Sequence, residues 1–108
     1  MAPRDIRVSV RLRQGRSGRW TATVRFGAPV AITDASSHYE IRLTPPPRKT
    51  RGWSHMILPT DRNIAQGENV SERFTSLRDK GRYRGVVTLE HAGEPGGTRI
   101  GRFSFRIP

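Results

Sequence analysis

The chain contains no cysteine, and only two of its 20 basic residues are lysine. The lack of cysteine excludes disulfides and thiolate metal sites. Small secreted domains often rely on disulfides, so it also favours an intracellular or particle-bound protein. No apolar run approaches membrane-spanning length, and no apolar signal-peptide segment follows the N-terminus. We therefore expect cytoplasmic synthesis without a signal peptide, with a virion or other particle as an alternative location, and no membrane partner.

Residues suited to catalysis or metal binding are also scarce. His38, His55 and His91 are far apart in the sequence, whereas a zinc site needs three or four converging ligands. Four of the nine carboxylates adjoin an arginine, as in Asp61-Arg62. Such a neighbour lowers the pKa of a carboxylate, which suits ion pairing rather than general-acid catalysis. We expect no enzyme activity, no metal, no cofactor and no small-molecule substrate.

Arginine is abundant, and it often occupies every second position beside apolar residues. Residues 6–13 and 19–26 both show this alternation. A period of two predicts half-buried strands with one apolar and one wet face. The glycine-containing loop at residues 14–18 has hairpin length, so these two strands should pair antiparallel.

Five more strand segments follow at roughly ten-residue spacing, with turn signals between them. Seven short strands predict an all-β sandwich or small barrel, with a loop at residues 61–69. We expect residues 1–5 to be a mobile N-terminal segment and residues 6–108 to form a single domain. The five further predicted strands are residues 39–43, 53–58, 70–77, 83–89 and 102–107.

The stretch Asp79-Lys80-Gly81-Arg82-Tyr83 has the Asp-x-Gly-x-Tyr pattern of a tyrosine corner, whose tyrosine hydroxyl bonds back to upstream backbone. Leu77 lies six residues before Tyr83, as in the Leu-x-Pro-x-x-x-Tyr element of fibronectin type III domains, with Asp79 in place of the proline. Trp20 and Tyr39 are similar in position to that family's core aromatics. The chain thus resembles the immunoglobulin/fibronectin type III superfold, which implies a single antiparallel β-sandwich of about seven strands. The predicted core contains Val8, Val10, Trp20, Ala22, Val24, Ile41, Leu43, Tyr83, Val87, Phe103 and Phe105.

The net charge of +11 is concentrated in the first third of the chain. Residues 1–33 carry seven basic residues and one acidic residue, a net +6. The planar guanidinium fork of arginine makes bidentate contacts with carboxylate or phosphate. The proline-rich loop at residues 45–53 and the last hairpin, with Arg82, Arg84, Arg102 and Arg106, are further basic regions. The predicted partner-binding residues are Arg7, Arg11, Arg13, Arg16, Arg19, Arg25, Arg48, Lys49, Arg51 and Trp53.

These features predict a non-catalytic structural or protein-interaction module. Its basic surface would dock on an acidic protein assembly or on neighbouring copies, as in an accessory or decoration component of a particle such as a phage virion. The alternative is a protein that binds nucleic acid without sequence specificity by neutralising phosphates, although no recognised nucleic-acid motif is present. The charge could also be a compositional bias that aids solubility. Trp53 could belong either to the core or to an interface.

Overall fold

The structure is a computed structural model, and it describes residues 5–34, 36–46, 52–57, 63–91 and 97–108. These residues form seven strands, and no helix occurs among them. The all-β prediction is therefore confirmed for the described part of the chain. The strands are β1 (Val8–Gln14), β2 (Trp20–Gly27), β3 (Ser37–Thr44), β4 (Trp53–Ile57), β5 (Asn69–Leu77), β6 (Gly81–His91) and β7 (Thr98–Ile107).

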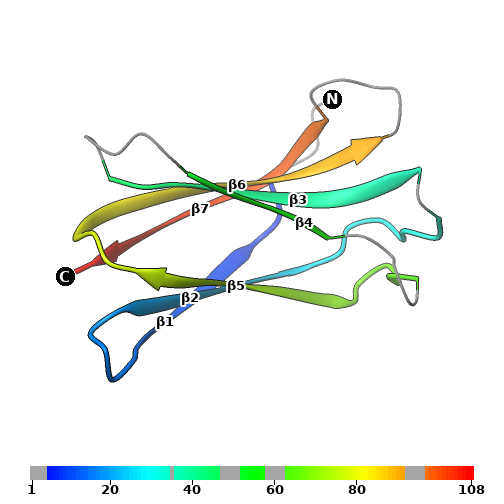
Figure 1. The fold of residues 1–108 in the computed structure, drawn as a ribbon. Coiled ribbons are helices and arrows are strands. Elements are labelled where there is room, and N and C mark those ends of the chain that lie inside the picture. Colours follow the sequence, from blue (N-terminus) through cyan, green and yellow to red (C-terminus); the bar gives the residue numbers. More distant parts are fainter. Residues whose placement is uncertain (1–4, 35, 47–51, 58–62, 92–96) are drawn as a thin grey trace.

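The strands form two antiparallel sheets. One has the order β1-β2-β5 and the other the order β4-β3-β6-β7. Figure 1 shows the two sheets as separate layers, with the β1–β2 hairpin extending beyond one end of the molecule. The predicted antiparallel pairing of the first two strands is confirmed, and β4 lies at an edge of its sheet.

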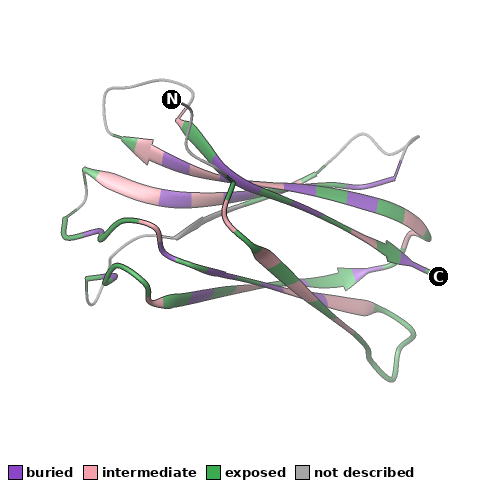
Figure 2. Ribbon diagram, turned by 180° about the vertical axis from the view of Figure 1, so that it is seen from behind, coloured by how far each residue is buried: buried purple, intermediate pink, exposed green. Residues whose placement is uncertain are grey.

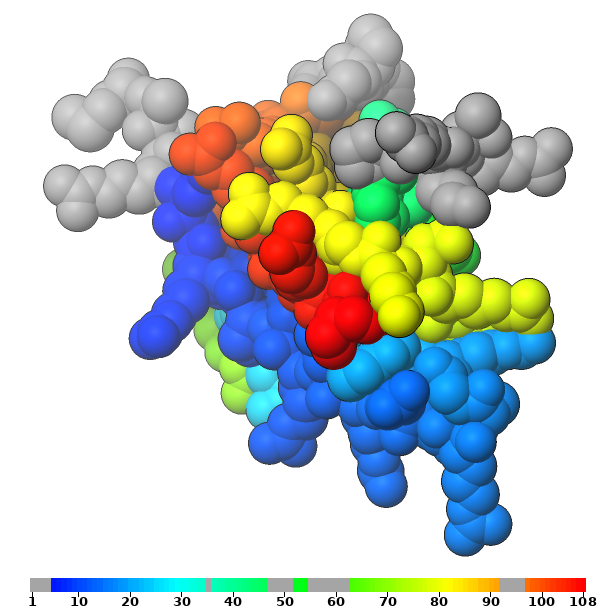
Figure 3. Space-filling view, turned by 90° about the vertical axis from the view of Figure 1, so that its left-hand side faces the viewer, coloured from blue at the N-terminus to red at the C-terminus, as the bar shows by residue number. Residues whose placement is uncertain are grey.

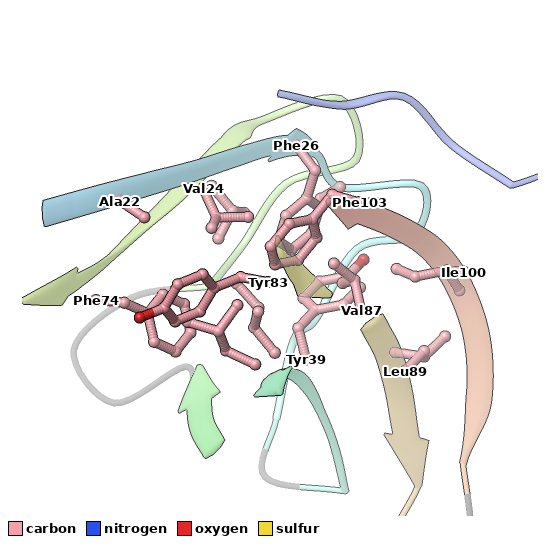
Figure 4. Packing of buried hydrophobic residues seen from close by; sticks show 14 of the residues in the cluster. Ala22, Val24, Phe26, Tyr39, Phe74, Tyr83, Val87, Leu89, Ile100 and Phe103 are labelled. Atoms are coloured by element: carbon pink, nitrogen blue, oxygen red, sulfur yellow. The ribbon is translucent and has the colours of Figure 1, made fainter. Parts of the chain in front are cut away.

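Alternation along the strands separates the core from the surface. In β6, Tyr83, Gly85, Val87 and Leu89 are all buried, and their neighbours are more exposed. Figure 2 shows this alternation as changing colour along the strands. Side chains from both sheets point into the same space, as Figure 4 shows. One hydrophobic core therefore lies between the two sheets.

Seven of the predicted core residues are buried, and four are only half-buried although they pack against the core. Val8 and Val10 lie on β1 and Phe105 lies on β7, and both strands are at sheet edges, where a neighbouring strand is missing on one side. Trp20 lies beside an irregularity in the β2–β5 pairing. Edge position thus accounts for Val8, Val10 and Phe105, and the irregular pairing accounts for Trp20. The fully confirmed residues are Ala22, Val24, Ile41, Leu43, Tyr83, Val87 and Phe103.

The tyrosine-corner hydrogen bond is present. The Tyr83 hydroxyl donates to the backbone oxygen of Asp79 at 2.8 Å, and the Tyr83 side chain is fully buried. Gly81, which opens β6, has φ +124°, a conformation that residues with a Cβ rarely adopt. The motif therefore fixes the turn between β5 and β6, which cross from one sheet to the other.

The N-terminal segment contacts the second sheet before it enters β1. The Ile6 amide donates to the Ile100 carbonyl at 2.8 Å, and Asp5 lies 3.7 Å from Arg99 and 3.5 Å from Arg102. Residues 1–4 of the predicted mobile segment lie outside the described residues, so its mobility stays a prediction. The β6–β7 register skips Ile100, so a bulge lies beside Gly101.

Candidate functional site

The outer face of the β1-β2-β5 sheet carries alternating arginine and hydroxyl side chains. In one row across the sheet, Arg11 pairs with Thr23 and Thr23 with Arg73; in the next row, Ser9 pairs with Arg25 and Arg25 with Ser71. Each arginine therefore has a hydroxyl residue as its neighbour on the adjoining strand. Side chains directly opposite across a strand pair lie only about 5 Å apart at their Cβ atoms. The two rows form a compact array.

An open groove of about 920 Å³ runs over this face, and we call it the arginine groove. Its polar lining includes guanidinium and hydroxyl groups from all three strands and from the hairpin tip. None of the described carboxylates lines it. Figure 3 shows side chains of the β1–β2 region, in blue, extending well away from the body of the molecule. The arginines of the groove are Arg11, Arg13, Arg16, Arg25 and Arg73, and its hydroxyl residues are Ser9, Thr21, Thr23 and Ser71.

The arginines of the groove are exposed, and none of them forms an ion pair with another described residue. Their charges therefore add to one another without local compensation. A guanidinium fork can donate two parallel hydrogen bonds to one carboxylate or phosphate. The hydroxyl groups between the forks can donate or accept further hydrogen bonds. The groove is chemically suited to a surface that carries several anionic oxygens.

The structure brings together some of the predicted partner-binding residues and separates others. Arg11, Arg13, Arg16 and Arg25 line the arginine groove. Arg7 and Arg19 are exposed but do not line it. The remaining basic candidates, Arg48, Lys49 and Arg51, lie outside the described residues.

Trp53 packs against the hydrophobic core instead of standing free. It is half-buried on the edge strand β4, opposite Leu43, and its ring centroid lies 6.3 Å from that of Tyr83. Tyr83 in turn stacks on Phe105 at 5.0 Å. Most of the apolar surface of Trp53 therefore serves the interior, and a role in a partner contact would use its remaining exposed edge.

Arg73 is a groove residue that the sequence did not point to. It lies on β5, nearly 50 positions beyond Arg25 in the chain, and the β2–β5 pairing brings it opposite Thr23. The alternation of Ser71, Arg73 and Thr75 with buried residues was a usable local signal. Knowledge of which strand pairs with β2 was needed to connect that signal with the first hairpin.

A second group of arginines lies on the outer face of the other sheet. Arg82 is directly opposite Arg106, Arg84 is opposite Ser104, and all three arginines are exposed. The predicted basic character of the last hairpin thus extends over two neighbouring strands. By contrast, Arg42 on the same face is paired with Glu40, with 2.9 Å between Nε and Oε1.

Ser37 and His91 form a contact of the kind that nucleophilic catalysis uses. Ser37 Oγ and His91 Nδ1 are 2.8 Å apart at the surface. A catalytic arrangement also needs a third group that orients the histidine, and no hydrogen bond to the other ring nitrogen occurs among the described residues. The described residues contain no group of three or more histidine, cysteine or acidic side chains placed to hold a metal ion. In the described part of the chain, no helix is long and apolar enough to cross a membrane.

No protein-family model matches the chain, and no curated protein matches it significantly.

Proposed function

We propose that this protein is a non-catalytic interaction module that docks on an acidic protein surface through the arginine groove. The observation that carries this proposal is the grouping, in one groove, of four hydroxyl residues with five arginines that have no ion-pair partner among the described residues, none of whose carboxylates lines the groove. Complementary charge speeds encounter with an acidic partner and fixes its register. Bidentate bonds from several guanidinium groups then give the docked state its specificity.

The groove chemistry favours carboxylates over a single nucleic-acid strand. Proteins that bind single strands use aromatic side chains as platforms on which bases stack, and no aromatic residue lines the groove. Duplex backbone contacts are a separate case, because arginine, serine, threonine and glutamine all serve as phosphate ligands. Duplex binding is therefore the competing function that an experiment has to separate.

We further propose that the fold is of the immunoglobulin/fibronectin type III kind. Two features support this: the tyrosine corner with its hydrogen bond to Asp79, and the strand order. Immunoglobulin constant-type domains place the first, second, fourth and fifth strands in one sheet and the third, sixth and seventh in the other. The present chain divides six of its strands in the same way and differs at β4, which pairs with β3 instead. An accessory component of a larger particle is the setting that we propose by analogy of fold, which does not by itself specify function.

The proposal is tested by measuring affinity near physiological salt for two probes, a labelled twelve-residue peptide of alternating Glu and Ser and a random-sequence DNA duplex. The double variant Arg11→Glu/Arg25→Glu should weaken peptide binding about tenfold, since two exposed ion pairs contribute roughly 0.2–1 kcal/mol each. The control Arg78→Glu/Lys80→Glu has the same change in net charge and should bind nearly as well as wild type.

Equal weakening by both double variants would contradict docking through the arginine groove. Duplex binding tighter than the usual non-specific range of about 10⁻⁴ to 10⁻⁶ M, together with weaker binding of the peptide, would replace the proposal with nucleic-acid binding. The circular dichroism of each variant, recorded alongside, should match that of wild type, because both arginines are exposed.

A further inference from the structure

The outer face of β6–β7 contains a like-charge contact that the fold itself does not require. Arg82 and Arg106 are directly opposite each other, and Arg84 lies two residues along β6. Like charges at directly opposed positions destabilise a strand pair. None of these three arginines forms an ion pair with another described residue. Exposed sites on a sheet accept many uncharged residues, so nothing in the packing calls for two arginines here.

The other arginines described on this face each have an ion-pair partner, which sets these three apart. Glu40 accepts hydrogen bonds from Arg42 and Ser54. Arg99 and Arg102 both lie within ion-pair distance of Asp5. Among the described residues of this face, the arginines without an ion-pair partner thus lie at one end, beside the start of β6 and the end of β7. We call Arg82, Arg84 and Arg106 the β6–β7 cluster.

A carboxylate bound between Arg82 and Arg106 would turn their mutual repulsion into a favourable interaction. Two guanidinium groups that repel each other in the free protein can both donate charge-assisted hydrogen bonds to one anionic group placed between them. Ser104, which lies opposite Arg84, adds a hydroxyl donor next to the cluster. This combination of guanidinium and hydroxyl groups repeats the chemistry of the arginine groove on a different sheet.

The two basic sites belong to outward faces of sheets that enclose a common core, so they point to opposite sides of the molecule. We propose that the β6–β7 cluster is a second, independent binding site for carboxylate groups of an acidic protein, and that one copy of the chain bridges two acidic surfaces. The second site goes beyond the single docking face of the proposed function. The bridging role rests on both sites.

The test is an NMR titration of the whole chain with the hexapeptide Glu-Ser-Glu-Ser-Glu-Ser. Six residues span at most about 22 Å, which is less than the smallest extent of the molecule, 23 Å. One peptide therefore cannot cover both faces. Saturable shifts are expected in two sets of amides, one around Thr23 and Ser71 and the other around Arg84 and Ser104, at two peptides per chain.

Variants then assign each set of shifts to its site. Arg82→Ser/Arg106→Ser should abolish the shifts around Ser104 and leave those around Thr23, and Arg11→Ser/Arg25→Ser should do the reverse. The matched control Arg78→Ser/Lys80→Ser lowers the net charge equally and should keep both sets.

Shifts in the arginine groove alone, at one peptide per chain, would overturn the second site and leave the proposed function intact. The absence of saturable shifts on both faces would overturn both. Loss of the Ser104 shifts in the control variant would show that binding near Ser104 depends on net charge alone. That result would overturn the second site. A random duplex that displaces the peptide from the β6–β7 cluster and binds it more tightly than about 10⁻⁶ M would overturn the assignment to a protein partner.

Discussion

The ring of Phe103 lies directly on the backbone of Gly85, its partner in the β6–β7 pairing. A Cβ atom built at Gly85 would lie 1.9 Å from Cζ of the ring, far inside van der Waals contact. The absence of a side chain at position 85 is therefore what lets the ring occupy the core at this point. An aromatic residue that covers a glycine on the neighbouring strand also protects backbone that would otherwise lack side-chain cover.

This contact predicts that Gly85→Ala destabilises the fold. The added methyl group has to displace the Phe103 ring within a packed core, and overpacking of this kind costs about 1–3 kcal/mol. Chemical denaturation measures the change in the free energy of unfolding. Gly27→Ala is the matched control, because Gly27 lies in a strand with nothing within 4 Å of its added Cβ. If Gly85→Ala has the same free energy of unfolding as Gly27→Ala, the Phe103 ring moves aside without cost and the prediction is wrong.

Tyr83→Phe removes the hydroxyl of the tyrosine corner and keeps the ring. The Asp79 carbonyl then loses the donor 2.8 Å away, and a typical intramolecular hydrogen bond contributes about 0.5–1.5 kcal/mol to stability. We expect a lower midpoint of denaturation with an unchanged m-value. An unchanged midpoint would mean that water replaces the hydroxyl and that the corner contributes little to stability.

The variant Arg106→Thr should change stability and peptide binding in opposite directions. The substitution removes the like-charge contact with Arg82 and introduces a residue with high β-propensity. It should raise the free energy of unfolding by roughly 0.2–1 kcal/mol while weakening peptide binding at the β6–β7 cluster. Thermal melting and the NMR titration measure the two effects. Arg78→Thr, outside the strands, should change neither; a loss of stability in Arg106→Thr would refute the repulsion argument.

The hydrogen bonds of Glu40 predict how the stability of the protein depends on pH. Hydrogen bonds from Ser54 and then Arg42 hold the pKa of Glu40 below its ordinary value of 4.5. A carboxylate whose pKa is lower in the folded state contributes stability above about pH 4.5, and this contribution is lost as the pH falls through the lowered value. Wild type should therefore be more stable than Glu40→Gln at pH 7, and the difference should shrink in acid. Urea denaturation of both proteins between pH 3 and pH 7 measures this difference in the free energy of unfolding. A difference that stays constant with pH would contradict a lowered pKa of Glu40.

Much of the fold could be predicted because its signals are local. Alternation within β2 and β6 identified their buried faces, since successive side chains of a strand point to opposite sides whatever the strand packs against. The tyrosine corner spans only five residues, so its pattern could be recognised without the rest of the chain. The gap between the first two strands had the length of a hairpin loop, which determined how they pair.

The other parts of the fold could not be predicted from local patterns, because they depend on which segments far apart in the sequence pack against each other. Ile32 and Ile64 exchange two backbone hydrogen bonds across 32 positions, and neither segment alone has a strand pattern. Trp53 could not be assigned until its ring was seen against Tyr83. Val8 and Phe105 showed the apolar alternation of a core residue, but their half-burial followed from the edge positions of β1 and β7.

The sequence by itself determined that the chain forms strands, which residues of each strand face inward, and that arginine dominates the outward positions. Only the tertiary structure decided which arginines share a surface. Arg11 and Arg25 meet through a hairpin, but Arg73 joins them because β5 pairs with β2, and Arg82 faces Arg106 because β6 pairs with β7. The physical reason is that side-chain direction depends on backbone geometry within a few residues, whereas strand pairing depends on the fold of the whole chain.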